Sequence, residues 1–258
     1  MPRALALGLL QGPAELLPVS SSGHLALVPR LLGWDYAELP ADARKTFEVA
    51  LHAGSAPALA LALRGEIGRE PLQQALMFLP PAAIGLAFER PIERRLGGLR
   101  SVALAQVIAG TLLIAADLRP ERRCEPNALD ALAVGLAQAA ALVPGVSRSG
   151  AALTAARLRG LSRPASASLS LRAALPVTVG AGVLKGVRAV RDGVPSELRK
   201  PAAVGAAAAC VSALAALPLA RGTRWRGIAL YRIGLGLGAL GLCWRGGQTG
   251  PRLEPSRR

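Results

Sequence analysis

The sequence predicts an all-α polytopic integral membrane protein built from two inverted-topology repeats, and three observations support this fold class. First, 52% of the 258 residues are hydrophobic and the mean hydropathy is +0.37, whereas roughly half of the residues of a soluble domain are apolar even when glycine is included. Second, short arginine-rich connections separate the apolar runs and leave no room for a soluble module. Third, a serine-rich motif occurs twice, 127 residues apart. We expect a single membrane domain over residues 1–258.

The formal charge of +15 is expected to face membrane surfaces rather than nucleic acid. The 31 basic residues are spread over every connection, and aromatic residues make up only 3% of the chain, so a stacking platform for bases is missing. Because arginine occurs on all loops, the positive-inside rule does not orient the chain. Cys124, Cys210 and Cys243 lie far apart in the sequence, which argues against a zinc site and against a disulfide framework.

The first informative stretch, QGPAELLPVSSSGH, runs from Gln11 to His24 between two apolar runs. Pro13 and Pro18 exclude one uninterrupted helix, and the serines followed by glycine predict a second helix that begins near Ser22. A carboxylate, three hydroxyls and an imidazole at membrane depth cost free energy unless they are paired. Such a cost is usually tolerated at functional sites. The alternative is an ordinary serine-capped helix in a loop between two membrane segments.

The next candidate is the pair Glu48 and His52 within the apolar run 46–63. Residues four apart share one face of a helix, so this pair marks a second candidate site. The alternative is a glutamate near the membrane interface and a histidine that is hydrogen-bonded and only packs in the core.

The remaining predicted spans are residues 73–88 with a break at Pro80-Pro81, 102–116, 129–143, 169–187, 202–220 and 228–244. Several are shorter than the ~20 residues that cross a bilayer upright, and the Gly/Pro/Arg-rich tail 246–258 is expected to be disordered.

An internal repeat appears when residues 8–33 are laid over residues 135–160 without gaps. Eleven of the 26 positions are identical, and they include the core Val-Ser-x-Ser-Gly. Broken helices at matching positions of two halves are typical of membrane proteins whose site lies at the repeat interface. We therefore expect repeat 1 over about 1–120 and repeat 2 over about 128–245, each with a broken re-entrant helix hairpin that carries its serine-rich motif. The turns Ser20–His24 and Ser147–Gly150 should meet near mid-membrane.

The two copies of the motif differ in their chemistry. Three positions carry the difference: Glu15, Ser21 and His24 of the first copy correspond to Leu142, Arg148 and Ala151 of the second. One copy therefore offers an acid, a base or a nucleophile, and the other offers a cation. Together they predict a site for an anion that is also chemically attacked.

At these residues the sequence resembles the undecaprenyl-diphosphatase family, the bacitracin-resistance membrane phosphatases. That family has an (E/Q)-x-x-x-E motif leading into L-P-V-S-S-[ST]-G-H, and here Gln11-x-x-x-Glu15 leads into Leu17-Pro-Val-Ser-Ser-Ser-Gly-His24. Its second motif, P-G-x-S-R-S-x-x-T, corresponds to Pro144-Gly-Val-Ser-Arg-Ser-Gly-Ala-Ala152. Residues 45–49, 112–116 and 160–163 are also similar, so the resemblance covers nearly the whole chain. The departures are Ala152 for the final Thr, Ser168 where the family is expected to carry Glu, and Arg172 in a stretch that the family fills with apolar residues. They bear on activity or substrate identity and not on the fold.

The resemblance implies an enzyme of the bacterial plasma membrane that hydrolyses undecaprenyl (polyprenyl) diphosphate to the monophosphate and phosphate. Such an enzyme recycles the lipid carrier of cell-wall synthesis and confers bacitracin resistance. Arg148 is the expected clamp on the terminal phosphate, and Glu15 is a general base or a metal ligand. Ser21 is the first candidate nucleophile, with His24 as the alternative nucleophile or the acid that protonates the leaving group.

The expected substrate-binding residues are Gln11, Ser20, Ser22, Ser147, Ser149 and Gly150. A divalent cation, Mg²⁺ or Ca²⁺, is implied by the family and by hard oxygen ligands, with Glu15 and Gln11 as its candidate ligands. Two other functions stay open: a flippase or transporter for an anionic lipid, because inverted repeats also occur in transporters, and a non-catalytic relative that binds the carrier lipid. Membrane orientation and oligomeric state, including a homodimer, are not decided by the sequence.

Overall fold

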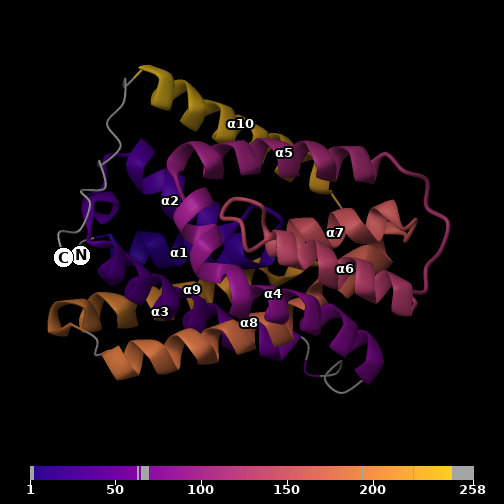
Figure 1. Ribbon diagram of the computed structural model, residues 1–258, viewed down its shortest axis with the longest axis horizontal. Helices are drawn as coiled ribbons and strands as arrows, with labels where there is room; N and C mark the ends of the chain where they lie inside the picture. The colour runs from indigo at the N-terminus through magenta and orange to yellow at the C-terminus, as the bar shows by residue number, and fades with distance from the viewer. Residues whose placement is uncertain (1–2, 63, 65–69, 193–194, 223, 246–258) are drawn as a thin grey trace.

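The computed structural model describes residues 3–62, 64, 70–192, 195–222 and 224–245, and almost all of them lie in helices (Figure 1). The helices are α1 (Ala4–Leu16), α2 (Ser21–Leu31), the 3-10 turn η1 (Asp35–Glu38), α3 (Ala41–Ala62), α4 (Pro71–Leu96), α5 (Leu99–Asp117), α6 (Ala128–Ala140), α7 (Arg148–Leu158), α8 (Arg163–Asp192), α9 (Ser196–Ala220) and α10 (Trp225–Arg245). In this described part, a single bridge between Arg123 and Leu161 is the only β-structure. Helices α4, α5, α9 and α10 are long and apolar enough to cross a membrane. The prediction of an all-α polytopic membrane protein is confirmed, whereas the predicted disordered tail 246–258 lies outside the described residues.

The predicted break in the first motif is confirmed, and the second motif breaks in the same way. Ser20 caps α2, and its Oγ accepts a hydrogen bond from the Gly23 N–H at 3.2 Å. Ser147 caps α7, and its Oγ accepts from the Gly150 N–H at 3.1 Å. Both serines have positive φ, 73° and 74°, a backbone conformation that costs a non-glycine residue roughly 1–3 kcal/mol. Each half of the chain therefore stores the same strain at the same point.

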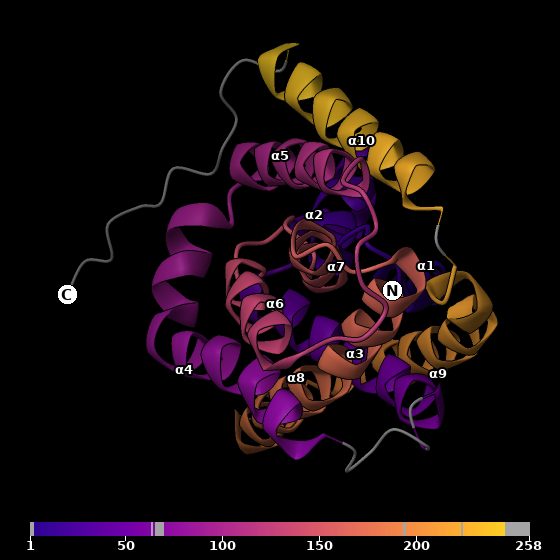
Figure 2. The same ribbon diagram turned by 90° about the vertical axis from the view of Figure 1, so that its right-hand side faces the viewer.

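The element order repeats, since α1–α5 and α6–α10 each contain two short helices followed by three long ones. Helix α1 packs on α9, α6 packs on α4, and α5 packs on α10, so each half is held by the other. Figure 1 shows the hairpin α1–α2 toward the left end of the molecule and α6–α7 toward the right end. In the end-on view of Figure 2, α2 and α7 lie in the middle and the longer helices surround them. The inverted topology of the two repeats across a bilayer stays a prediction.

Two glycines of the repeat explain how closely the halves approach. A Cβ added to Gly8 would lie 2.2 Å from the carbonyl oxygen of Gly205, and one added to Gly135 would lie 2.2 Å from the carbonyl oxygen of Leu76. Any side chain at these positions would push α1 away from α9 or α6 away from α4. Small residues at such crossings are the usual device for helix packing in membranes.

The predicted break at Pro80-Pro81 is wrong, because α4 continues through both prolines. Pro81 has no N–H and leaves the carbonyl of Met77 without its helical donor. The Gln138 side chain on α6 fills this place, with its Nε2 donating to the Met77 carbonyl at 3.0 Å. A neighbouring helix thus restores the missing hydrogen bond, which is how prolines are tolerated inside membrane helices.

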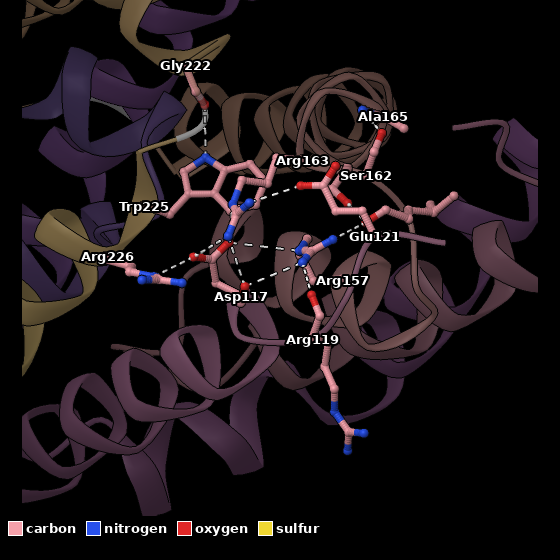
Figure 3. Close-up of polar contacts among 12 residues, drawn as sticks. Asp117, Arg119, Glu121, Arg157, Ser162, Arg163, Ala165, Gly222, Trp225 and Arg226 are labelled. Carbon is pink, nitrogen blue, oxygen red and sulfur yellow. Dashed lines mark hydrogen bonds and ion pairs between the residues drawn. The ribbon is translucent and has the colours of Figure 1, made fainter. Parts of the chain in front are cut away.

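An arginine cluster fixes the far end of α7 (Figure 3). Asp117, at the end of α5, is only 2% exposed and accepts hydrogen bonds from Arg163 at 2.7 Å and from Arg226 at 2.9 Å. Arg157, fully buried near the end of α7, donates to backbone carbonyls that include that of Asp117 at 3.3 Å. The cluster joins α5, α7, α8 and α10, so the helix that begins at Arg148 is anchored at its other end.

Candidate active site

The two serine-rich turns contact each other directly. Ser149 Oγ, from the second turn, donates to the Leu17 carbonyl at 2.9 Å. In the opposite direction, the Gly145 N–H donates to Ser22 Oγ, from the first turn, at 3.4 Å. The structure therefore brings together the two motifs that the sequence places 127 residues apart.

Glu15 stands at the centre of this junction and is 9% exposed. Its Oε2 accepts hydrogen bonds from Ser21 Oγ at 2.9 Å and from Gln11 Nε2 at 3.2 Å. Its Oε1 lies 3.3 Å from Nη2 of Arg148, which belongs to the second turn. A hydroxyl that donates to a carboxylate is the arrangement of a nucleophile and its base, and the guanidinium adds a cation to it.

Among the described residues, Arg148 donates hydrogen bonds to the protein through Nη2 alone. Nη2 donates both to Oε1 and to the backbone carbonyl of Glu15, each at 3.3 Å. Nη1 is buried and has no hydrogen-bond partner among the described residues. A buried donor without an acceptor is destabilising by itself, and a phosphate oxygen is an acceptor whose geometry matches the guanidinium fork. Arg148 therefore has one donor free for an anion.

His52, on α3, belongs to the site, and Glu48 one turn earlier lies in the wall of the adjoining cavity. His52 Nδ1 is 3.1 Å from Oε2 of Glu15 and 3.1 Å from Nε2 of Gln11. Glu48 instead accepts a hydrogen bond from the Tyr36 hydroxyl at 2.9 Å. Burial and the nearby Glu48 carboxylate raise the pKa of Tyr36 above its ordinary value, so this hydroxyl keeps its proton. The pair selected by helical spacing thus divides into a residue that contacts Glu15 and one that does not.

A cavity of about 380 Å³ opens beside Glu15, a volume within the roughly 300–1,000 Å³ range of small-molecule sites. It extends outward between α3 and α4, where Lys45 Nζ and Glu93 Oε2 form an ion pair at 2.7 Å in its wall. Seven of the predicted site residues line it: Glu15, Ser20, Ser21, Ser22, Ser147, Arg148 and Ser149. The other three, Gln11, His24 and Gly150, are buried and are not among the residues that line it.

His24 is 2% exposed and both of its ring nitrogens are engaged. Nδ1 lies 2.8 Å from the Ser20 carbonyl oxygen, and Nε2 lies 2.9 Å from the hydroxyl of Tyr231 on α10. This geometry favours a role in holding the first turn, and a catalytic role for His24 stays a prediction.

Arg232 and Gln106 are the site residues that the sequence analysis missed. Arg232, fully buried on α10, donates from Nε to Gln106 Oε1 at 2.8 Å and from Nη1 to the Pro18 carbonyl at 2.9 Å. Its Nη2 donates to the carbonyls of Gly145 at 2.9 Å and Val146 at 2.8 Å. One side chain therefore joins both serine turns. The available signal was an arginine inside an otherwise apolar predicted span, because ionisable residues at such positions usually serve a site.

The oxygen atoms around Glu15 fit a divalent cation only if the substrate completes its coordination. In the described part of the chain, no group of three or more His, Cys, Asp or Glu residues could hold a metal. Gln11, however, is fully buried, and its Oε1 has no hydrogen-bond partner among the described residues. The same amide group contacts the Glu15 carboxylate through Nε2. A carboxylate and an amide oxygen are ligands that Mg²⁺ and Ca²⁺ accept, with phosphate oxygens and water as the others.

Comparison with known proteins agrees with the resemblance that the two motifs carry. Residues 4–238 match the family described as bacitracin resistance protein BacA. A protein of Geobacter sulfurreducens named undecaprenyl-diphosphatase is 40% identical, with 81% of this chain and 84% of that protein covered. Proteins of the same name are 37% identical in Geobacter metallireducens, over 81% of this chain and 84% of the relative, and 34% identical in Trichlorobacter lovleyi, over 93% and 96%. The chain is a multi-pass membrane protein that belongs to the bacitracin resistance protein BacA family.

Proposed function

We propose that this protein hydrolyses undecaprenyl diphosphate, or a closely similar polyprenyl diphosphate, to the monophosphate and inorganic phosphate. The observation that carries the proposal is the meeting of Glu15 and Ser21 from the first motif with Arg148 from the second. A nucleophile, its base and a phosphate clamp then lie within hydrogen-bonding distance on one cavity wall. The names of the relatives support the same activity.

In the first step, Ser21 Oγ attacks the terminal phosphorus while its proton passes to Glu15 Oε2, 2.9 Å away. The bond between that phosphorus and the bridging oxygen breaks, and its electron pair leaves with the polyprenyl monophosphate, which takes the proton from Glu15. Phosphoryl transfer depends mainly on positioning and charge neutralisation. Arg148 supplies the neutralisation from its free Nη1, and Gln11 and His52 hold the carboxylate in place.

In the second step, a water molecule attacks the phosphoserine and gives its proton to Glu15. The bond between Ser21 Oγ and phosphorus breaks, Glu15 returns the proton to Ser21 Oγ, and inorganic phosphate leaves. A divalent cation held by Glu15 and Gln11 would neutralise further charge on the diphosphate. Ser21 and Glu15 therefore act in both steps, as expected of a covalent mechanism with one nucleophile and one base.

The buried position of the site suits a lipid substrate. The diphosphate can enter the cavity beside Glu15 while its isoprenoid tail stays among the apolar outer faces of the long helices. We place the enzyme in the bacterial plasma membrane, where it would return the lipid carrier of cell-wall synthesis to its monophosphate form and so confer bacitracin resistance.

The test is phosphate release from undecaprenyl diphosphate by the purified protein in detergent, with Ser21→Ala as the matched variant. Release that depends on Ser21 supports the proposal. A protein that binds the diphosphate lipid but releases no phosphate, with or without Mg²⁺ or Ca²⁺, is a lipid-binding or lipid-moving protein and refutes it. Neither the site nor the relatives favour that alternative.

A further inference from the structure

Arg232 and Gln106 occupy corresponding places in the two halves of the chain. They lie 126 residues apart on α10 and α5, which pack side by side (Figure 2). Gln106 Nε2 donates to the Val19 carbonyl at 3.0 Å, and Arg232 Nη2 donates to the Val146 carbonyl at 2.8 Å. Val19 and Val146 are themselves equivalent in the repeat. The same backbone carbonyl is therefore held in both halves, once by an amide and once by a guanidinium.

Each of these carbonyls belongs to the peptide that precedes a strained serine, Ser20 or Ser147. In a trans peptide the C=O and N–H groups point in opposite directions. With the carbonyls held on Gln106 and Arg232, which are fully buried, the N–H groups of Ser20 and Ser147 are turned to the opposite side of each turn. Both serines line the cavity in which the phosphate is expected.

Arg232 is held by oxygen dipoles alone. Its guanidinium meets one amide oxygen and three backbone carbonyls, and among the described residues it has no carboxylate partner. A buried charge without a counter-charge is expensive, and an apolar residue would fill the same place at lower cost. A site that must fix two backbone peptides beside an anion gives a reason for a fully buried arginine here, because only its planar fork reaches carbonyls of both turns.

We propose that Arg232, together with Gln106, is a positioning residue that aims the Ser20 and Ser147 N–H groups at the phosphoryl group in its transition state. This inference rests on the proposed phosphatase function and adds the reason why the two turns keep their strained backbone. The devices are not equivalent, since Arg232 holds both turns whereas Gln106 holds the first turn and Arg232 itself.

The test compares Arg232→Lys and Gln106→Met with the parent enzyme for kcat, KM, thermal unfolding and inhibition by orthovanadate, a mimic of the phosphoryl transition state. Removing one donor of this type lowers kcat by about 10²–10³-fold, so we expect kcat per folded Arg232→Lys molecule to fall about 10²-fold while KM changes little. Orthovanadate inhibition should weaken in parallel, because both depend on the aimed N–H groups. Gln106→Met should show the same pattern with a smaller loss, since the second turn keeps its anchor.

The matched control is Arg226→Lys, the same substitution at an earlier arginine of α10. Arg226 contacts Asp117 in the remote cluster, so this variant should unfold at lower temperature and keep kcat per folded molecule. Arg232→Lys and Gln106→Met that behave like this control would overturn the inference, because both residues would then only stabilise the fold. Where Arg232→Lys fails to fold, Gln106→Met decides the question alone. If the parent protein binds orthovanadate but releases no phosphate, the proposed function is refuted. Weaker orthovanadate binding in the two variants would then still support the inference, and unchanged binding would overturn it. If the parent protein neither binds orthovanadate nor releases phosphate, both the proposed function and the inference are overturned.

Discussion

Replacement of Glu15 by glutamine separates the chemistry of the site from its ability to bind phosphate. Glutamine keeps the size of the side chain and removes its charge. The Glu15 carboxylate accepts hydrogen bonds from Gln11, Ser21 and Arg148. A glutamine has one acceptor oxygen for these three donors, so at least one donor is left without a partner, at a cost of about 1–3 kcal/mol.

The expected loss of turnover exceeds this structural effect. Without the carboxylate, no base takes the Ser21 proton, and general acid–base help is typically worth about 10²–10⁴-fold. We therefore expect kcat of Glu15→Gln to fall by at least about 10²-fold. Binding of the diphosphate lipid should persist or tighten, because Arg148 loses its competing carboxylate at 3.3 Å and a negative charge beside the diphosphate disappears.

The assay measures phosphate release and diphosphate-lipid binding on the same purified variant. Asp117→Asn is the control: it also removes a buried carboxylate that neutralises arginines, but at the remote cluster. It should lower the unfolding temperature, since breaking a buried ion pair costs roughly 3–5 kcal/mol, and leave kcat per folded molecule intact. Unchanged phosphate release in Glu15→Gln would refute the mechanism and leave Glu15 as a structural acid. A transporter coupled to Glu15 would lose uptake and never release phosphate.

Four further outcomes are expected. Arg148→Lys should lower kcat/KM by about 10–100-fold, the equivalent of one charge-assisted hydrogen bond, because one ammonium cannot contact Glu15 and phosphate as two guanidinium nitrogens do; near-parent kinetics would place Arg148 outside the clamp. Ser21→Ala should abolish phosphate release and the radiolabelled phosphoenzyme, whereas His24→Ala should keep measurable turnover at a lower unfolding temperature; the reverse result would make His24 the nucleophile. Chelation with EDTA should stop phosphate release, and Mg²⁺ or Ca²⁺ should restore it; full activity in EDTA speaks against the cation. In a cysteine-free background, Leu32→Cys and Arg159→Cys should react with impermeant reagents from opposite sides of the membrane, and labelling from one side would exclude inverted repeats.

Local signals in the sequence were sufficient to predict the backbone break at the first turn. Pro18 follows the end of α1, which continues through Pro13 to Leu16, and the serine run begins α2 one residue before the predicted start. The copy at Ser147 follows by the same physics. Prolines, caps and short side chains act within a few residues of their own position, so a single sequence carries their consequences directly.

The failures of prediction share a physical cause, which is a partner distant in the chain. Pro81 does not break α4 because Gln138 reaches the Met77 carbonyl from another helix. Arg232 was not selected because its acceptors lie far away in the sequence, from 86 residues for the Val146 carbonyl to 214 residues for the Pro18 carbonyl. Local rules do not state which buried group finds such a partner. The packing of α6 on α4 supplies it for the Met77 carbonyl, and the packing of α10 on α5 supplies it for Arg232.

The chemical difference between the repeats follows from what a phosphate site requires. Two identical halves would place either two carboxylates or two cations against the same phosphate. Two carboxylates would repel the substrate, and two cations would leave the site without a base. The structure keeps what is geometric in duplicate, the strained serines at 73° and 74° and the held carbonyls of Val19 and Val146. It changes what is electrostatic, so that Ser21 contacts a base in its own half, and Arg148 from the other half contacts the same base.

A variant with Arg148→Ser would restore the symmetry of that position, and we expect it to fold with both turns intact but to lose phosphate binding and turnover together. Loss of the fold instead would show that the cation serves the packing of the turns rather than the anion. Because the Ser149 bond to Leu17 and the Arg232 fork hold the turns independently of Arg148, the structure favours the first outcome.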